Sequence, residues 1–129
     1  MRDCHAYDYA ILRLVPQVER EEFINVGVIL SCPDRQFLGV RVYVDRDRVA
    51  AFAPSVDVAT VLLHLTSFEA VCRGGAAAGP IGELPPRQRF LWLVAPRSTI
   101  IQTSPVHTGW LRDPDAALEK LLRQYVHVG

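Results

Sequence analysis

The sequence predicts an α+β fold, with a small antiparallel sheet of about four strands and with helices packed on one face of the sheet. Two segments of alternating apolar residues follow one another around a short turn at 33–36, as the strands of a hairpin do. The helical patterns come mainly after these strands and do not alternate with them, which disfavours a parallel sheet built from crossover units. The 129 residues are the usual size of one domain, so we expect a single domain over 1–129.

Alternating residues mark the first three strands. In 7–15 one face holds Ala10, Leu12 and Leu14, and the other holds Tyr7, Tyr9, Ile11 and Arg13. The second strand, 26–32, places Val26, Val28 and Leu30 on one face, opposite Asn25, Gly27 and Ser31. The third strand, 37–44, directs inward Leu38, Val40, Val42 and Val44. The turn between the last two strands begins with Pro33-Asp34, so we expect them to pair as an antiparallel hairpin.

Capping signals and helical spacing predict three helices. Asp45 is the expected N-cap of a short helix around 49–52. Ser55 or Asp57 starts a longer helix to about residue 72, with an apolar stripe of Val58, Val61, Leu62, Leu65 and Phe68. The sequence Asp113-Pro114-Asp115 combines a cap, a first-turn proline and a second acidic residue, which is typical of a helix start. The apolar stripe of this last helix is Leu118, Leu121, Leu122 and Tyr125.

The remaining segments are less regular. Residues 76–86 are rich in Gly, Ala and Pro, and we expect a mobile loop. The segment 86–94 is open between helix and strand, because leading prolines suit a helix start whereas its aromatic and aliphatic run also suits a strand; we favour the helix. A fourth strand is predicted at 99–103, followed by a turn-rich loop at 104–109.

Composition narrows the classes of function. The 14 basic and 14 acidic residues balance, so the chain lacks the general attraction to phosphate of most nucleic-acid binders. Its 3 cysteines form no C-x-x-C pair and its 4 histidines are scattered, so we expect reduced thiols, no metal and no cofactor. The N-terminus lacks the apolar centre of a signal peptide, and no stretch is long enough to span a membrane. We therefore expect a cytoplasmic protein.

Polar and aromatic side chains from three strands share one predicted face of the sheet. They are Tyr7, Tyr9, Arg13, Asn25, Arg41 and Tyr43. A face this polar does not suit a sealed core, and a face this aromatic does not suit plain exposure to solvent. For Asn25 and Gly27 two interpretations remain. They shape the start of the second strand, or they form the floor of a binding site. We favour the first, because asparagine bonds nearby backbone and glycine in a strand often marks a bulge or a close neighbour.

Three further candidate residues, Arg97, Ser98 and His107, lie on proline-bounded loops beside the predicted fourth strand. Binding residues are often found on loops held by a scaffold. The guanidinium of Arg97 and the hydroxyl of Ser98 suit an anion, and the rival interpretation is an ion pair of Arg97 with Glu22 or Asp8. His107 suits a general base, and the rival is a contact that stiffens its loop.

Three segments together show a family resemblance: YAILRLVP at 9–16, EFINVGVIL at 22–30 and APRSTIIQTSPVHTG at 95–109. Over nearly its whole length the chain resembles the bacterial family catalogued as domain of unknown function 3037. The resemblance implies no established activity. It suggests one partner, a kinase similar to the HipA toxin and encoded by a neighbouring gene.

The leading hypothesis is a small accessory or protein-interaction domain with a protein partner. An enzyme is disfavoured, because no nucleophile, base and acid appear in a recognisable arrangement. The alternative is a ligand-binding or enzymatic domain with Arg97, His107 and Asn25 in one cleft. A weaker alternative is stacking of nucleic-acid bases on the Tyr and Arg residues of the sheet face. Convergence of Arg13 with these residues would favour a ligand site, and a flat patch would favour a partner.

Overall fold

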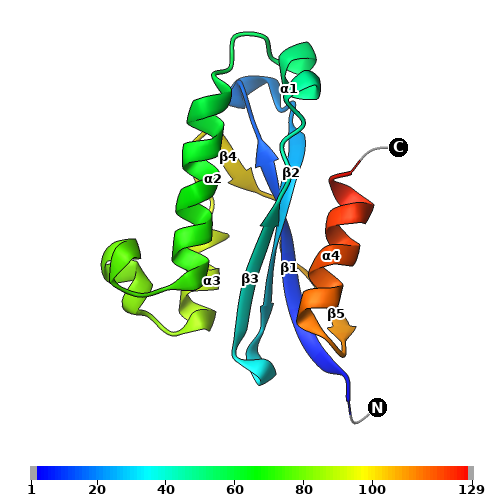
Figure 1. Ribbon diagram of the computed structural model, residues 1–129, viewed down its shortest axis with the longest axis vertical. Coiled ribbons are helices and arrows are strands. Elements are labelled where there is room, and N and C mark those ends of the chain that lie inside the picture. Colours follow the sequence, from blue (N-terminus) through cyan, green and yellow to red (C-terminus); the bar gives the residue numbers. More distant parts are fainter. Residues whose placement is uncertain (1–2, 128–129) are drawn as a thin grey trace.

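A computed structural model describes residues 3–127 of the chain (Figure 1). Its strands are β1 (His5–Leu14), β2 (Ile24–Cys32), β3 (Phe37–Val42), β4 (Ile101–Thr103) and β5 (His107–Leu111). Its α-helices are α1 (Arg46–Phe52), α2 (Val58–Arg73), α3 (Pro86–Leu93) and α4 (Pro114–Tyr125). Short 3-10 helices are η1 (Val18–Arg20), η2 (Pro33–Arg35) and η3 (Ala76–Glu83). The predicted α+β class is confirmed, and so are the helix at 86–94 and the N-caps Asp45, Asp57 and Asp113.

The strands form one antiparallel sheet in the order β3-β2-β1-β4, and β5 also pairs with β1. β4 pairs with residues 12–14 of β1 and β5 with residues 5–9, so the two short strands share one edge. The predicted hairpin of β2 and β3 is confirmed, with the turn η2 between them. The sheet has one strand more than expected, because residues 107–111 pair with β1.

A corner at Ser104 divides β4 from β5. The buried Ser104 donates its backbone N–H to the Ile11 carbonyl at 2.8 Å, and its Oγ accepts from the Ile11 N–H at 2.9 Å. One serine thus satisfies both backbone groups of Ile11 where the ladder changes strands. The loop predicted at 104–109 is therefore wrong over its second half. Turn residues such as Pro105 indicated a loop, whereas the pairing with distant β1 decides the conformation.

Helices cover both faces of the sheet: α2 and α3 lie on one face and α4 on the other (Figure 1). The core under α2 and α3 includes Ala10, Leu12, Leu14, Ile29, Leu65, Phe68 and Phe90. The core under α4 includes Ile11, Val28, Leu30, Cys32, Leu118, Leu121 and Leu122. The prediction that the helices share one face is wrong, because β1 and β2 are apolar on both faces and each face needs its own cover.

A β-bulge in β2 explains the face of each residue there. Leu12 pairs with Gly27 and Arg13 pairs with Asn25, which leaves Val26 as an extra residue between them. Val26 consequently joins the α2 core, whereas the following Val28 joins the α4 core. The prediction that Val26 and Val28 share one face is wrong for this reason. The prediction that Asn25 and Gly27 share the other face is wrong for the same reason. A Cβ on Gly27 would lie 2.8 Å from the backbone O of Arg41, so the glycine permits close approach of β3.

A buried arginine of α3 closes the end of α2. Arg89 is 8 % exposed, and its Nη1 donates to the carbonyls of Val71 and Cys72 at 2.7 Å each. Its Nε donates to the carbonyl of Leu84 at 2.9 Å. The last carbonyls of a helix have no partner within the helix, and Arg89 satisfies two of them. Within residues 3–127 no carboxylate lies within ion-pair distance of Arg89. The positive charge of its guanidinium is therefore stabilised by the dipoles of the backbone carbonyls.

The segment between α2 and α3 is more regular than predicted. Where we expected a loop at 76–86, η3 (Ala76–Glu83) consists of two short 3-10 turns joined by a kink at Gly79, and it packs against α2. The backbone N–H of Gly75 donates to the Gly82 carbonyl at 2.9 Å. A Cβ on Gly82 would lie only 2.0 Å from the Gly75 carbonyl O, so glycine is required there for close approach of the two backbones.

Candidate functional site

The predicted polar face of the sheet is present, but α4 occupies part of it. On β3, Arg41 pairs with Asp115 at 3.1 Å and with Glu119 at 3.0 Å, both on α4. On β2, the Asn25 Nδ2 donates to the backbone O of Tyr125 at 3.0 Å, at the end of α4. Arg41 and Asn25 therefore orient α4 on the sheet. The hydrogen bond of Asn25 therefore goes to the distant end of α4, whereas we expected a bond to nearby backbone at the strand entry.

Replacing Asn25 with alanine is expected to lower the free energy of unfolding by about 1 kcal/mol, the usual net value of one hydrogen bond. Asn25→Asp should be worse than Asn25→Ala, because a carboxylate beside the last carbonyls of α4 meets the negative end of the helix dipole. Thermal unfolding of the two variants and the wild type measures both effects. An unchanged melting temperature of Asn25→Ala would show that the bond to Tyr125 contributes nothing.

Arg13 is held by an aromatic ring. Its guanidinium carbon lies 4.0 Å from the centre of the Phe23 ring, within the range of a cation–π contact. Arg13 Nε and Asn25 Oδ1 are buried atoms that lack a hydrogen-bond partner within residues 3–127. Within this same part of the chain Arg13 makes no ion pair, so packing against Phe23 fixes its position.

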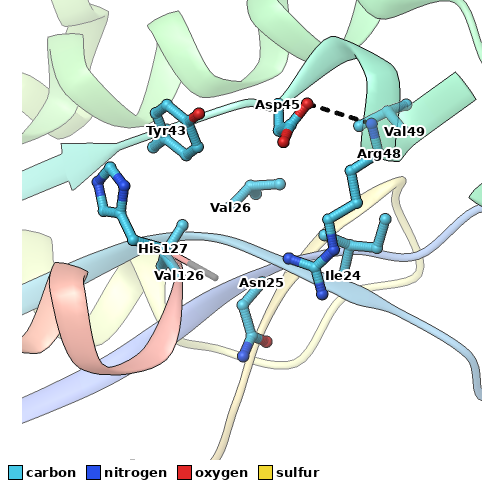
Figure 2. A pocket seen from close by; sticks show the side chains of 9 residues that line it. All are labelled: Ile24, Asn25, Val26, Tyr43, Asp45, Arg48, Val49, Val126 and His127. Atoms are coloured by element: carbon cyan, nitrogen blue, oxygen red, sulfur yellow. Dashed lines mark hydrogen bonds between the residues drawn. The ribbon is translucent and has the colours of Figure 1, made fainter. Parts of the chain in front are cut away.

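A small cleft lies between the start of β2, α1 and the end of α4 (Figure 2). Its lining residues are Ile24, Asn25, Val26, Tyr43, Asp45, Arg48, Val49, Val126 and His127. The rings of Tyr43 and His127 stack along one wall, with centres 4.3 Å apart. Asp45 accepts from the backbone N–H of Arg48 at 3.2 Å and thereby caps α1.

This cleft combines an asparagine with an arginine and a histidine, as the ligand-site hypothesis requires. The arginine and the histidine are Arg48 and His127, which the sequence did not single out, in place of Arg97 and His107. The volume is about 50 Å³. Because one water needs roughly 10–15 Å³ of such volume, the cleft has room for a few waters and not for a metabolite.

Arg97 caps the end of α3 on the opposite side of the sheet. Its Nη2 donates to the Trp92 carbonyl at 2.7 Å, and its guanidinium carbon lies 5.0 Å from the Trp92 ring and 5.4 Å from the Phe68 ring. Burial lowers the pKa of Arg97. The rival ion pair predicted for Arg97 is wrong, because Glu22 pairs with Arg20 and Asp8 pairs with Arg87 at 2.8 Å.

Of the other two loop candidates, Ser98 lies next to Arg97 and His107 lies apart from it. Ser98 is exposed. His107 is exposed at the start of β5, and its ring centre lies 5.4 Å from that of Tyr9, on the α4 face. The structure thus brings Arg13, Asn25 and His107 to one face and Arg97 to the other, and they do not converge on one cleft.

Part of the α4 face remains uncovered, because α4 packs on β2 and β3 and leaves β1 and β5 open beside it. A groove of about 470 Å³ lies there, which we call the tyrosine groove. Its lining residues are Tyr7, Tyr9, Trp110, Leu111, Arg112, Asp113, Ala116, Ala117, Lys120, Leu121, Gln124 and Tyr125. Two of the lining residues from α4, Ala116 and Ala117, have small side chains.

Tyrosine rings form the floor and one end of the tyrosine groove. The ring centres of Tyr7 and Tyr9 are 5.7 Å apart, and those of Tyr9 and Tyr125 are 6.1 Å apart. Tyr7 pairs with Gly109 of β5, and a Cβ on Gly109 would lie 2.7 Å from the Tyr7 ring. Glycine at this position therefore lets the Tyr7 ring lie across β5. The sequence predicted Tyr7 and Tyr9 on this face, but Tyr125 only as part of an apolar stripe.

Hydrogen bonding and burial raise the pKa of two tyrosines in the groove, Tyr9 and Tyr7. The Tyr9 and Tyr125 hydroxyls share a hydrogen bond of 3.4 Å, which raises the pKa of Tyr9 to about 12. Burial raises the pKa of Tyr7. Neutral tyrosines keep both an apolar ring and a hydrogen-bond donor available to a binding partner.

Within residues 3–127 no group of three or more His, Cys, Asp or Glu side chains is placed to hold a metal ion. In that part of the chain, no helix has the length and apolar character that a membrane crossing requires. Cys4, Cys32 and Cys72 are free thiols, and burial raises the pKa of Cys72 to about 12.

Comparisons with known proteins place the chain in a family without naming an activity. Neither the curated proteins nor the solved structures contain a significant match to it. A family model described as "Protein of unknown function (DUF3037)" matches residues 9–126, a span that runs from the second half of β1 to the end of α4 and includes all three segments of the resemblance. The chain therefore belongs to the DUF3037 family.

Proposed function

We propose that the chain is a small cytosolic protein-interaction domain that binds an extended segment of a partner protein in the tyrosine groove. The observation that supports this proposal is the uncovered part of the α4 face, where the sheet presents Tyr7 and Tyr9 beside an amphipathic helix. On the opposite face of the sheet, α2 and α3 cover the core. An aromatic surface left open in this way is typical of a binding site.

The size and composition of the groove fit such a role. Its volume of about 470 Å³ is comparable with the roughly 300–1,000 Å³ of small-molecule sites, so the groove has room for several side chains of a bound segment. Tyr and Trp are enriched at interaction hot spots, and Trp110 at this groove is 69 % exposed. A kinase similar to HipA, suggested by the family resemblance, is the first partner to test.

The alternatives have less support. A ligand-binding or enzymatic role that uses Arg97, His107 and Asn25 meets the difficulty that Arg97 lies across the sheet from Asn25. Nucleic-acid binding on the sheet face meets a different difficulty, because α4 covers the part of the face with Arg41. The net charge of +0 gives no general attraction to phosphate.

Site-specific photocrosslinking in the native host tests the proposal. A photoreactive phenylalanine analogue replaces Lys120, which lines the tyrosine groove, or the matched control Leu63, which is 69 % exposed on α2. We expect a discrete protein adduct from position 120 and none from position 63. The captured protein, once purified, should bind the wild type and bind Tyr7→Ala about tenfold more weakly, as for a moderate hot spot.

Two results of the crosslinking would overturn the proposed function. The first is an absence of adducts at position 120, and the second is an equal pattern at positions 120 and 63. Thermal unfolding of Tyr7→Ala controls for loss of the fold. If Tyr7→Ala is folded and binds the captured protein like the wild type, the groove is not the binding site.

A further inference from the structure

The rings of the tyrosine groove follow one another at a nearly constant spacing. The centres of Tyr7 and Tyr9 are 5.7 Å apart, and those of Tyr9 and Tyr125 are 6.1 Å apart. A polyproline II helix advances about 3.1 Å per residue, so two residues span about 6.2 Å. One X-Pro pair of such a segment therefore matches the interval between neighbouring rings. Aromatic-lined grooves are a recurring way of binding proline-rich segments.

The walls of the groove supply the hydrogen-bond donors that such a segment needs. A polyproline II helix makes no internal hydrogen bonds, so its carbonyls are free to accept hydrogen bonds from a binding protein. Tyr7, Lys120 and Gln124 bring a hydroxyl, an ammonium group and an amide N–H to the groove. Burial raises the pKa of Tyr7, which keeps its hydroxyl a donor.

The charges along the groove favour a segment that also carries an acidic residue. Arg112 and Lys120 line the groove, and so does one carboxylate, that of Asp113. Asp113 already accepts from the backbone N–H of Asp115 at 3.1 Å as the N-cap of α4. The two cations therefore dominate the field in the groove. Two cations are too few for a nucleic-acid strand, because proteins usually bind the backbone of such a strand along a continuous, positively charged groove.

We propose that the tyrosine groove binds a proline-containing, acidic segment of the partner protein in the polyproline II conformation. This inference rests on the proposed function and specifies the class of segment that the same groove recognises. X-Pro pairs pack on the rings of Tyr7, Tyr9 and Tyr125, and the acidic residue lies beside Lys120. The fixed dihedral angles of proline reduce the entropy that the segment loses on binding.

Fluorescence anisotropy with labelled probes and the whole chain tests this specificity. The probes are a peptide of X-Pro repeats flanked by glutamates, the same peptide with alanine for proline, the same peptide with lysine for glutamate, and oligothymidine. We expect the acidic proline peptide to bind most tightly. The alanine peptide should bind about tenfold more weakly, since its backbone is not preorganised. The lysine-flanked peptide should bind about fivefold more weakly, the factor for an exposed ion pair.

Variants of the protein test where the peptide binds and which flanking charge the groove prefers. Lys120→Glu should reverse the preference between glutamate and lysine flanks, while the exposed control Leu63→Ala should leave every affinity unchanged. Equal binding of the alanine peptide, or tighter binding of oligothymidine than of the acidic proline peptide, would overturn the inference. If no peptide binds although position 120 still crosslinks to a partner, this inference fails and the proposed function stands. If the adducts are also absent, both fail.

Discussion

Replacing Arg89 with methionine is expected to lower the free energy of unfolding by about 3–5 kcal/mol, the cost typical of removing one partner from a buried charged network. Methionine keeps most of the side-chain volume but leaves the carbonyls of Val71, Cys72 and Leu84 without their donor. Chemical denaturation should show a lower midpoint with an unchanged slope.

Two further variants separate charge from geometry at this position. Arg89→Lys retains a cation, but one ammonium group does not reproduce the planar fork that reaches three carbonyls, so we expect an intermediate loss. Arg73, an exposed arginine in the last turn of α2, is the matched control, and Arg73→Met should change stability by less than about 0.5 kcal/mol. Equal losses for Arg73→Met and Arg89→Met would show that the capping contacts contribute little.

Replacing Leu118 with alanine is expected to cost roughly 2–5 kcal/mol, as for other buried leucines. Leu118 is 0 % exposed in the core between α4 and the sheet, and its Cδ1 would lie 2.8 Å from a Cβ on Gly39. Gly39 of β3, which has no side chain, therefore leaves room for the side chain of Leu118. The same denaturation measurement tests the prediction.

The control for Leu118→Ala is Leu63→Ala, the same substitution on a helix but at a position that is 69 % exposed. That variant should remain within about 0.5 kcal/mol of the wild type. Since α4 forms one wall of the tyrosine groove, Leu118→Ala should also weaken peptide binding, and Leu63→Ala should not. A stable Leu118→Ala protein would mean that the surrounding core closes over the missing side chain.

Local chemistry in the sequence was sufficient for most helices and for the first hairpin. A carboxylate cap and a helical apolar stripe predicted α2 and α4, because both signals depend on residues close in the chain. Pro33 and Asp34 likewise predicted the turn between β2 and β3. Such features form largely independently of the rest of the fold.

Features that depend on distant partners could not be predicted in the same way. β5 contains Gly109 and follows Pro105, and local turn signals outweighed its pairing with β1. The bulge at Val26 reversed the faces of the rest of β2, since strict alternation assumes that no residue is inserted. The contacts of Arg89 with the end of α2 depend on a tertiary approach that no spacing in the sequence reveals.

The candidate site was predicted in part for the same reason. Alternation placed Tyr7 and Tyr9 on the face that lines the tyrosine groove. His107 was predicted on a loop, and its position beside Tyr9 was not foreseen. The expectation for Arg97 came from its residue type, whereas its hydrogen bond to Trp92 is that of a helix cap. Lys120 was not singled out, because its importance depends on where α4 lies across the sheet.

The position of β1 at the centre of the sheet affects how the chain emerges during synthesis. β1 leaves the ribosome first, but two of its partners, β4 and β5, are made only after α3. Contacts this distant in sequence slow folding, since a long stretch of chain must close before they form. Until α4 is complete, Ile11, Val28 and Leu30 have no helix above them. A nascent chain halted before residue 113 therefore displays an apolar strip of sheet, the kind of surface that chaperones bind and that promotes aggregation.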